Sequence, residues 1–545
     1  MDKKQLEQVY DFVIIGSGFG GSVSAMRLVE KGYSVLVLER GKKFRDQDFP
    51  KSNWAFWKYL YNPLLRSFGI MQMSILQGIL VLHGAGVGGG SLGYANVLMK
   101  PSDEMFAAPA WRDLADWKKI LNPFYGIARK MLGVTENPCL EMGDRVLQQV
   151  AQDMGRAETY HSTEVGIFFG EKEGQRYPDP YFDGEGPPRD ACKYCGGCMV
   201  GCRYNAKNTL VKNYLYFAEK WGAHVCAEAL VQDITPLPPG QKDEARYVVD
   251  FHRSTALLGS KNRRVRARNV VLAAGVLGTL QLLFHCRDSA QTLPVLSSKL
   301  GTMVRTNSEA LMGATARKMD LDYSRGIAIG SVFQADEVTN IEPVRYPAGS
   351  GLIRLLAWPL LDEDKSVFHR LARTAWEIIC HPLDFLRSMV FPGWAERTTV
   401  LLVMQTEDNY MHVKPGRNLW TFWRKGLVGD EYTIPPKIKV GSQATRAFAE
   451  KVKGFPVNAF TESIFGMPVT AHILGGCPMG RNEEEGVIDL QCQVFNYPGL
   501  YVIDGSIVPA NPGINPSLTI TALAEYAVDQ IPIKKGHTIN KKIGY

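Results

Sequence analysis

The first forty residues contain the feature that most constrains the fold of this 545-residue chain. An apolar run at Tyr10–Ile15 leads into the glycine turn Gly16-Ser-Gly-Phe-Gly-Gly21, and helical spacing follows over Ser22–Lys31. A second apolar run, Tyr33–Leu38, ends in the acid Glu39. The order strand, glycine turn, helix, strand and acid is that of a Rossmann unit. We therefore expect an α/β fold whose N-terminal part binds a dinucleotide.

Three of the four glycines of this turn have an expected role. Gly16 permits the tight turn, Gly18 lets the backbone approach a diphosphate, and Gly21 lets the helix pack closely on the strand. The diphosphate would lie on the exposed N–H groups and the positive dipole at the helix start. Glu39 is placed to accept hydrogen bonds from a ribose diol, which disfavours the 2′-phosphate of NADP. The turn alone does not separate FAD from NAD.

Length, charge and the chain start narrow the class of protein. A chain this long exceeds what one hydrophobic core usually supports, so we expect at least two domains. The net charge of +7 is mild for 545 residues, and no dense basic run indicates a nucleic-acid partner. Met1–Tyr10 lacks the apolar stretch of a secretory signal, and the most apolar window, Gly69–Leu82, is too short to cross a bilayer. We expect a cytoplasmic protein, at most in contact with a membrane surface.

A second glycine cluster, His83–Gly93, is too rich in glycine to form a helix or strand. Its flanks are apolar and carry few polar spacer residues, which favours a loop lying flat against a ligand over a flexible linker. With this cluster the chain resembles the glucose–methanol–choline (GMC) flavin oxidoreductases, and within them the cholesterol oxidase-like branch. That branch carries a GVGGGS loop where this chain has Gly86–Ser91.

Four more segments extend the resemblance along the whole chain in the order of the family. They are Arg268–Gly275, Leu300–Glu309, His472–Gly476 and Leu500–Pro516. The resemblance implies FAD as the cofactor. Together with the first glycine turn, it implies that FAD is held by Gly16, Gly18, Gly21, Glu39, Gly86, Gly88, Gly89, Gly90, Ser91, Ala274, Gly275, Asp504, Gly505, Asn515 and Pro516.

Oxidation of an alcohol by a flavin needs a base for the hydroxyl proton and a hydride path to flavin N5, and a histidine suits the proton step. By the resemblance, His472 faces the flavin and the substrate hydroxyl, while Asn515 orients that hydroxyl. The branch also implies a glutamate near a sterol substrate, for which Glu342 and Glu309 are the candidates. We prefer Glu342, because the proline after it favours extended backbone at a strand edge or in a loop near the site.

Cys192, Cys195, Cys198 and Cys202 have the C-x2-C-x2-C-x3-C spacing of bacterial ferredoxins, although Arg203 stands where those proteins have proline. Three interpretations stay open. An iron–sulfur cluster would carry electrons from the flavin to a partner, or four thiolates would hold zinc. Otherwise these are buried thiols that pack a loop, since many GMC members have a similar segment without being described as metalloproteins.

Aromatic residues interleaved with arginines gather in 44–73 and 352–394, and the second stretch contains an expected amphipathic helix at Val367–Cys380. Two interpretations stay open: a surface that takes a lipid-like alcohol from a membrane, and an ordinary second-domain core with exposed arginines. Farther on we expect a strand at Thr398–Gln405 and a hairpin of 409–413 with 419–423. These would belong to an antiparallel sheet that roofs the flavin site.

We therefore expect an α/β protein with a Rossmann-type FAD-binding domain and a discontinuous α+β substrate domain built on that antiparallel sheet. The first would comprise 8–48, 78–105, 190–310 and 464–545, and the second 49–77, 106–189 and 311–463. The expected function is FAD-dependent oxidation of a bulky hydrophobic alcohol, a sterol or long-chain alcohol, with oxygen or a redox carrier as acceptor. The alternatives are a dehydrogenase that passes electrons through a cluster at Cys192–Cys202, and a flavin- and lipid-binding module without turnover.

Overall fold

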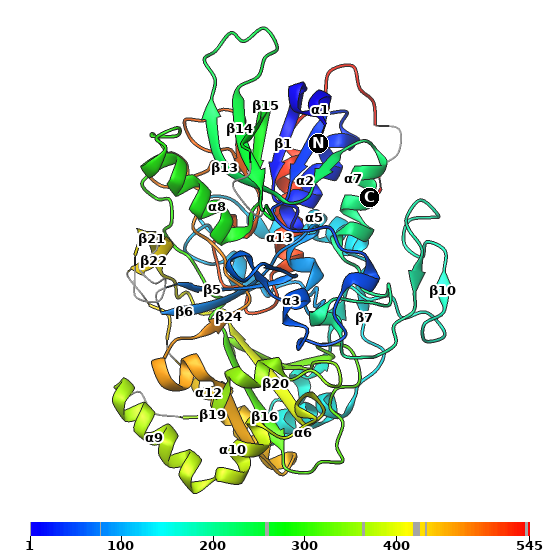
Figure 1. Ribbon diagram of the computed structural model, residues 1–545, viewed down its shortest axis with the longest axis vertical. Helices are drawn as coiled ribbons and strands as arrows, with labels where there is room; N and C mark the ends of the chain where they lie inside the picture. The colour runs from blue at the N-terminus through cyan, green and yellow to red at the C-terminus, as the bar shows by residue number, and fades with distance from the viewer. Residues whose placement is uncertain are drawn as a thin grey trace.

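Two seven-stranded sheets organise the protein, for which a computed structural model describes residues 2–76, 78–256, 261–361, 366–417, 426–430, 433–435, 437–539 and 543–544. Figure 1 shows the sheet that contains β1 and β2 in the upper half of the molecule and the sheet that contains β16 and β20 in the lower half. A three-stranded sheet of β5, β6 and β24 lies between them. The predicted α/β fold with a Rossmann unit and an antiparallel second sheet is confirmed. The residue ranges of the two domains stay a prediction.

The first sheet is a Rossmann sheet with the order β12-β2-β1-β15-β14-β13. Strand β1 runs parallel to β2 on one side and to β15 on the other, so that Ile14 pairs with both Val37 and Val271. Apolar residues on both faces of β1 and β2 are buried, as expected for a parallel sheet covered on both sides. The strands are β1 (Val9–Ile15), β2 (Val35–Leu38), β12 (His224–Cys226), β13 (Ala229–Pro236), β14 (Tyr247–Arg253), β15 (Arg263–Leu272) and β25 (Leu500–Val502), the last pairing with the end of β15.

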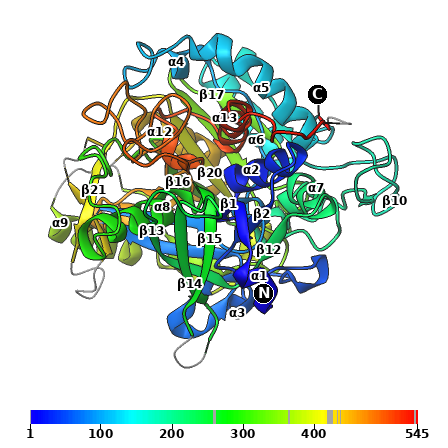
Figure 2. The ribbon, with the colours of Figure 1, turned by 90° about the horizontal axis from the view of Figure 1, so that it is seen from above.

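Four helices pack on one another beside this sheet (Figure 2). They are α2 (Phe19–Glu30), α5 (Trp117–Leu132), α7 (Tyr214–Lys220) and α13 (Ser517–Asp529), and α8 (Gly275–Phe284) follows directly after β15. Helix α2 begins three residues before the predicted start at Ser22, because Gly18 within the glycine turn is already its N-cap. A buried ion pair joins α2 to α13, with Arg27 Nε 2.8 Å from Glu525 Oε2. The first and last parts of the chain thus form one packed unit.

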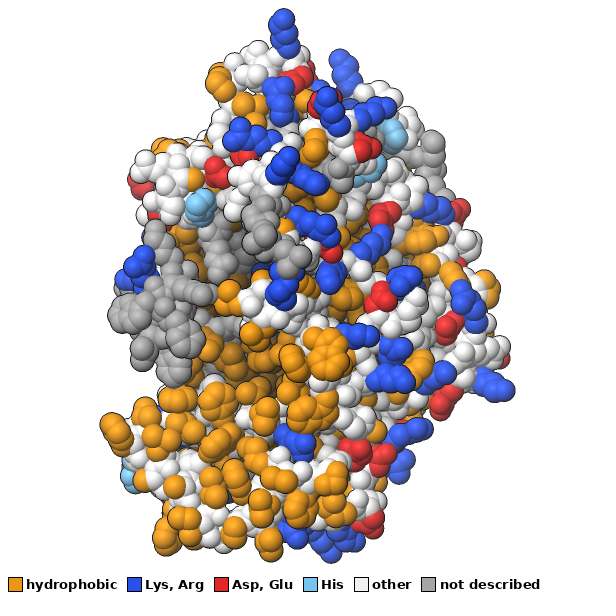
Figure 3. Space-filling model, viewed as in Figure 1, with side chains coloured by type: hydrophobic (Ala, Val, Ile, Leu, Met, Phe, Trp, Pro, Cys, Tyr) orange, Lys and Arg blue, Asp and Glu red, His pale blue; other side chains and the backbone are white. Residues whose placement is uncertain are grey.

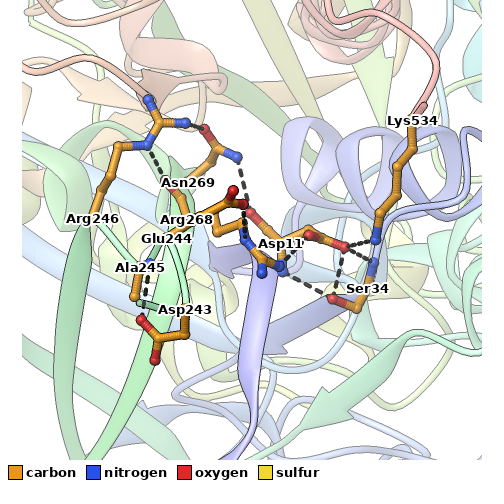
Figure 4. Close-up of polar contacts among 9 residues, drawn as sticks. All are labelled: Asp11, Ser34, Asp243, Glu244, Ala245, Arg246, Arg268, Asn269 and Lys534. Atoms are coloured by element: carbon orange, nitrogen blue, oxygen red, sulfur yellow. Dashed lines mark hydrogen bonds and ion pairs between the residues drawn. The ribbon is translucent and has the colours of Figure 1, made fainter. Parts of the chain in front are cut away.

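Asp11 near the start of β1 ties three segments together (Figure 4). Its carboxylate accepts hydrogen bonds from Ser34 before β2, at 2.8 and 3.0 Å, and from Arg268 of β15 at 2.7 Å. Lys534, after α13, donates to the same carboxylate at 2.5 Å. Burial alone would raise the pKa of Asp11, but its hydrogen bonds with Lys534 and Ser34 hold that pKa below its usual value.

The second sheet is antiparallel throughout and has the order β19-β23-β16-β20-β18-β17-β8. The predicted strand at Thr398–Gln405 is confirmed as β20, with the same bounds. Helices α6 (Met142–Asp153) and α12 (Lys439–Lys451) pack against this sheet. The other strands are β8 (His161–Ser162), β16 (Ala310–Ala316), β17 (Ser331–Gln334), β18 (Thr339–Val344), β19 (Ala357–Pro359) and β23 (Gly454–Ala459).

Two predictions for this region differ from the structure: the place of Glu342 and the bounds of the hairpin. Glu342 does not lie at a strand edge or in a loop but in β18, between β20 and β17. Pro343 is tolerated because the pairing with β17 ends at Ile341, so no ladder bond requires its missing N–H. The structure has a hairpin here, but its first strand is later than predicted: β21 (His412–Gly416) overlaps the predicted 409–413 at two residues and pairs with β22 (Gly426–Asp430). The segment 419–423 lies outside the described residues.

The small central sheet joins distant parts of the chain. Strand β6 (Ile79–Gly84) pairs antiparallel with β5 (Met71–Leu76) and parallel with β24 (Val469–Thr470). Strand β6 leads into the second glycine cluster, and β24 leads to His472. Because parallel strands end at the same edge, this sheet brings the second glycine cluster and His472 together.

Two helices, α9 (Val367–Cys380) and α10 (Pro382–Met389), pack on the outside of the lower half (Figure 1). The bounds of α9 match the predicted amphipathic helix. In the part of the chain that the structure describes, no helix combines the length and the hydropathy that crossing a bilayer requires.

Candidate active site

One continuous cavity of about 640 Å³ runs from the Rossmann sheet to the antiparallel sheet. Its Rossmann end is lined by both glycine-rich segments, its middle by His472 and Asn515, and its far end by apolar side chains of the second sheet. The cofactor-binding residues expected from the sequence divide into two sets. Gly16, Gly18, Glu39, Gly89, Gly90, Ala274, Gly275, Asp504, Gly505, Asn515 and Pro516 line the cavity, whereas Gly21, Gly86, Gly88 and Ser91 lie behind it.

The first glycine turn has the geometry that a diphosphate requires. Gly16 has φ +99°, and a Cβ there would lie 2.2 Å from the carbonyl oxygen of Ala273. A Cβ at Gly18 would meet no atom within 4 Å, so open space lies beside the N-terminus of α2. A Cβ at Gly21 would lie 2.1 Å from the oxygen of Gly16. Gly16 and Gly21 therefore serve close packing, while Gly18 leaves room for a ligand on the N–H groups of α2.

The second glycine cluster is a loop packed directly on the first. A Cβ at Gly89 would lie 2.6 Å from Cα of Gly18. The N–H of Gly88 donates to Ser17 Oγ at 3.1 Å, and Ser91 Oγ donates to the carbonyl of Gly88 at 2.6 Å. Gly88 and Ser91 thus brace the loop, and Gly89 and Gly90 face the cavity. The interpretation as a flexible linker is wrong.

Two acids mark other parts of the dinucleotide end. Glu39 Oε2 accepts from Ser17 N–H at 3.1 Å and Oγ at 2.7 Å, and Oε1 accepts from Gly41 N–H at 2.8 Å. Asp504 follows β25 and accepts from Thr279 of α8 at 2.6 Å and from Ser506 N–H at 2.8 Å. Burial raises the pKa of Asp504, against the effect of these hydrogen bonds. Both carboxylates are held rigidly at the cavity wall.

His472 is oriented by a buried carboxylate. Its Nδ1 lies 2.9 Å from Oε2 of Glu309, which also accepts from Thr470 Oγ1 at 2.9 Å and from Ala471 N–H at 3.2 Å. Thr470 Oγ1 in turn accepts from the His472 N–H at 2.9 Å. Nδ1 faces the Glu309 carboxylate at this distance without an aligned hydrogen bond, and the other ring nitrogen, Nε2, is left for chemistry in the cavity. A base whose orientation is set by a third group is the arrangement found at many catalytic histidines.

Asn515 and Glu342 form a second pair. When the Asn515 amide nitrogen faces Glu342, it donates to Oε1 at 2.9 Å and to Oε2 at 3.2 Å. Glu342 is fully buried and does not line the cavity, so its carboxyl group lies behind Asn515 rather than beside a substrate. Burial raises the pKa of Glu342 to about 8, the Asn515 hydrogen bond opposes this shift, and the charge of Glu309 adds to it.

Two asparagines hydrogen-bond to the backbone just before Asn515, and neither was identified from the sequence. Asn307 Nδ2 donates to the carbonyl of Ile514 at 3.0 Å, and its Oδ1 accepts from Gly513 N–H at 2.9 Å. Asn340 of β18 donates to the carbonyl of Gly513 at 2.9 Å. Asn307 has φ +58°, a left-handed conformation that asparagine adopts more readily than most residues. The signal available in the sequence was that Asn307 lies two residues before Glu309, within the segment Leu300–Glu309 that resembles the family.

His83 is a further cavity residue that the sequence did not single out. It is the next-to-last residue of β6, at the start of the second glycine cluster, and its Nε2 lies 2.9 Å from Ser74 Oγ. Burial, with help from Arg40, lowers the pKa of His83 to about 3. His83 therefore stays neutral in the physiological range and can donate or accept a hydrogen bond without bringing charge to the cavity.

The far end of the cavity is apolar and large. Residues of β16, β18, β20 and β23 form one wall there, and residues of α3 (Phe56–Tyr59), β5 and η8 (Leu352–Leu356) form another. The apolar lining residues include Leu60, Met71, Met73, Leu311, Ile329, Val344, Ile353, Leu356, Trp394, Val400, Leu402 and Val457. A wall of this kind favours an apolar substrate of drug-like size over a sugar.

The four clustered cysteines lie away from this cavity. All four line a second cavity of about 250 Å³, together with Lys193, Arg203 and Lys207. Burial raises the pKa of Cys195 to about 11 and raises that of Cys192 further, so these thiols stay protonated at neutral pH when no metal is bound. Within the described residues, no group of three or more His, Cys, Asp or Glu side chains is placed to hold a metal ion. The structure thus gives no support to an iron–sulfur cluster or a zinc ion here.

Comparisons with known proteins agree with this geometry. Two models described as GMC oxidoreductase match residues 187–286 and 435–524, and a model described as NAD(P)-binding Rossmann-like domain matches 14–44. The chain is 42% identical to a cholesterol oxidase of Acinetobacter baumannii, over 98% of this chain and 96% of that protein. It is 43% identical to a cholesterol oxidase of Mycobacterium tuberculosis, over 97% of this chain and 92% of that one.

Solved structures share the fold at low sequence identity. Pyridoxine 4-oxidase from Mesorbium loti superposes with a TM-score of 0.60 at 16% identity, covering 96% of this chain and 99% of that one. The likeness covers nearly the whole of each chain and shows that the two proteins share a fold.

Proposed function

Because the chain belongs to the GMC oxidoreductase family, we propose that it binds FAD and oxidises a bulky apolar alcohol, a sterol in preference to a long-chain alcohol. The observation that carries the proposal is the single cavity that joins the two glycine segments to His472 and then to an apolar chamber. The similarity to two cholesterol oxidases supports the sterol.

The residues of the cavity fit FAD. The open space beside Gly18 and the N-terminus of α2 would take the diphosphate, and Glu39 would accept hydrogen bonds from the adenosine ribose. Gly89, Gly90, Ala274 and Gly505 give a wall without bulky side chains on the way to His472. Bound FAD would supply the acceptor for a hydride, two electrons with one proton, taken from the alcohol carbon.

The chain supplies the proton chemistry and the positioning. We assign to His472 Nε2 the removal of the hydroxyl proton as the C–H hydride leaves, which converts the alcohol to a ketone or aldehyde. Glu309 holds the ring in the tautomer that leaves Nε2 unprotonated and stabilises the imidazolium that forms. Asn515 orients the substrate oxygen, and Glu342 fixes the Asn515 amide from behind. Glu342 is then a positioning residue, not the base.

Oxygen is the acceptor we propose for the reduced flavin, in keeping with the relatives, which are oxidases by name. The alternative route through a cluster at Cys192–Cys202 rests on the spacing of the cysteines, and among the described residues no group of side chains is placed to hold a metal ion. The thiols line the second cavity together with Lys207, whose Nζ donates to three carbonyls, those of Leu92, Tyr94 and Cys198 at 2.8 to 3.0 Å. If anaerobically purified protein contained stoichiometric iron and acid-labile sulfide, that result would support the iron–sulfur cluster instead.

A substrate panel tests the proposal. Purified yellow protein is mixed without oxygen with a 3β-hydroxysterol, a long-chain primary alcohol and a hexose, and bleaching of the flavin absorbance is followed. We expect bleaching by the sterol, slower bleaching by the long-chain alcohol and none by the hexose. Bleaching by the hexose alone would contradict the apolar chamber, and no bleaching by any compound would indicate a binding module without turnover.

A further inference from the structure

A buried stretch of five residues, 305–309, lies between the backbone that carries His472 and the backbone that carries Asn515. All five residues are at most 2% exposed, and they directly precede β16. The apolar surface in the lower half of Figure 3 is formed by other segments, α9 and α10 among them, whose exposed residues include Phe368, Trp376, Ile379 and Leu383. Residues 305–309, which we call the bridging segment, can therefore act only inside the molecule.

One set of hydrogen bonds joins the bridging segment to the backbone around His472. Arg305 pairs with Leu474 in both directions, since its N–H donates to the Leu474 carbonyl at 2.8 Å and its carbonyl accepts from the Leu474 N–H at 2.9 Å. The carbonyl of Thr306 accepts from Thr470 Oγ1 at 3.0 Å. The chain is thus held to the bridging segment both before and after His472.

Asn307 joins the bridging segment directly to the chain just before Asn515. Its amide nitrogen donates to the carbonyl of Ile514, and its amide oxygen accepts from the N–H of Gly513. Because these bonds are made to two successive residues, they fix both the position and the direction of the backbone as it enters Asn515. The bridging segment thus holds the backbone before Asn515, while Glu342 holds its amide group.

Ser308 reaches the same part of the chain through an intermediate residue, Asn409. Ser308 Oγ accepts from Asn409 Nδ2 at 3.0 Å, and the Asn409 carbonyl accepts from Asn511 Nδ2, also at 3.0 Å. Arg305 Nη1 donates to that same carbonyl at 3.3 Å. Asn511 lies four residues before Asn515, so the bridging segment holds this part of the chain at two places.

A rare backbone conformation separates the two sets of contacts. Asn307 has φ +58° and Ser308 has φ +43°, and among the described residues no other two adjacent non-glycine residues both have positive φ. Such strain persists where the surrounding contacts over-determine the backbone, and it gathers at functional sites. In an extended strand, alternate side chains would face opposite ways. Here the left-handed pair bonds toward the asparagine side, whereas Thr306 and Glu309, before and after it, bond toward the histidine side.

We propose that Asn307 and Ser308 are positioning residues of the oxidation, and that their left-handed pair sets the Asn515 amide relative to the His472 ring. Neither residue lines the cavity, so both act through the backbone segments that they hold. The inference rests on the proposed function, in which the amide and the imidazole act on one alcohol oxygen. A relaxed backbone at this pair would shift one group against the other, which is why the strained conformation is retained.

Asn307→Gly and Ser308→Gly test the positioning, because glycine adopts the left-handed backbone without strain and lacks the side chain that bonds across. The matched control is Asn496→Gly, at an exposed asparagine with φ +67° outside the site. Flavin bleaching by saturating sterol is followed anaerobically by stopped flow, with rate constant and amplitude read separately. We expect both variants to keep their flavin and the wild-type amplitude, but to bleach about 10- to 100-fold more slowly, since small misplacements of reacting groups are costly. The control should match wild type.

The amplitude separates positioning from a merely structural role, which would lower flavin content and amplitude and leave the rate constant of the remaining holoprotein unchanged. That result would overturn the proposal, as would the wild-type rate constant in both variants or an equal slowing in the control. The pH at which the rate is half-maximal should stay that of wild type, because Glu309 still faces His472. Absence of bleaching in wild type would contradict the proposed function and the positioning together. Bleaching at one common rate in wild type and both variants would contradict the positioning alone.

Discussion

At the scale of single residues, the candidate site depends on two buried carboxylates with different tasks. Glu309 touches the imidazole of His472, and Glu342 touches the amide of Asn515. The sequence indicated His472 and Asn515 through their neighbours, and it also suggested both glutamates. It could not tell which glutamate serves which partner, because β16, β18 and β24 are distant in sequence and come together only through tertiary contacts.

Removing the charge from Glu309 tests whether this residue positions His472 or contributes to substrate binding. We expect Glu309→Gln to lower kcat for sterol at least about tenfold, because the imidazolium that forms at His472 loses its neutralising partner. KM is expected to stay near the wild-type value and the protein to stay yellow. The matched control is Glu337→Gln, an exposed acid outside the site. A rise in KM with unchanged kcat would show that Glu309 contributes to substrate binding alone.

The raised pKa of Glu342 makes a prediction about stability. The folded protein holds this proton up to about pH 8, whereas the unfolded chain releases it near the ordinary carboxyl value of 4.5. Stability is then greatest below the unfolded value and falls as pH rises through this window, because the unfolded state alone gains from releasing the proton. We expect Glu342→Gln to flatten the fall of Tm over this range, as read by differential scanning calorimetry.

Glu462 provides an internal comparison for that experiment. Burial raises its pKa to about 8 as well, in the turn before β24. Glu462→Gln should flatten the same profile, and the double variant should flatten it more than either change alone. An unchanged slope in the Glu342 variant would mean that its carboxyl is not the buried acid described here.

At the scale of elements, the sequence predicted regular structure well where one physical signal was strong. Strand β20 and helix α9 have the predicted bounds, and β1, α2 and β2 lie where the glycine turn placed them. The orientation of α9 could not be read from its periodicity, because the same stripe suits a core or an interface. The packing of the second glycine loop could not be predicted from the sequence either, because it depends on close contact between Gly89 and Gly18, which are far apart along the chain.

Two glycines of the first turn should respond differently to the same substitution. Gly18 has an ordinary φ of −70° and open space where a Cβ would lie. We expect Gly18→Ala to fold with a near-wild-type Tm of the flavin-free protein but to lose FAD, because the methyl group occupies the place of the diphosphate. Flavin content after desalting and Tm measured on flavin-free protein check this.

Gly21→Ala is the matched comparison, because its Cβ would lie 2.1 Å from the oxygen of Gly16. That variant should lose folding stability even without flavin, as backbone has to move to relieve the contact. If Gly18→Ala keeps its flavin, the diphosphate does not lie at the start of α2.

At the scale of the whole molecule, the reaction depends on bringing residues 16–39 and residue 472 to one cavity. The parallel pairing of β6 with β24 accomplishes this, since it sets the second glycine loop and His472 at the same edge of the central sheet. The antiparallel sheet then adds the apolar chamber, through residues of β16, β18, β20 and β23. The candidate catalytic and cofactor-binding residues thus lie at the junction of the two sheets rather than on either alone.

The rate of flavin bleaching by a sterol, measured anaerobically by stopped flow in wild type and His472→Ala, tests this junction most directly. The control is His161→Ala, which changes an exposed histidine of β8. We expect wild type and control to bleach at the same rate. His472→Ala should stay yellow and bleach about 10²- to 10⁴-fold more slowly, the range that a general base contributes. Bleaching of His472→Ala at the wild-type rate would show that this imidazole does not meet the substrate beside the flavin.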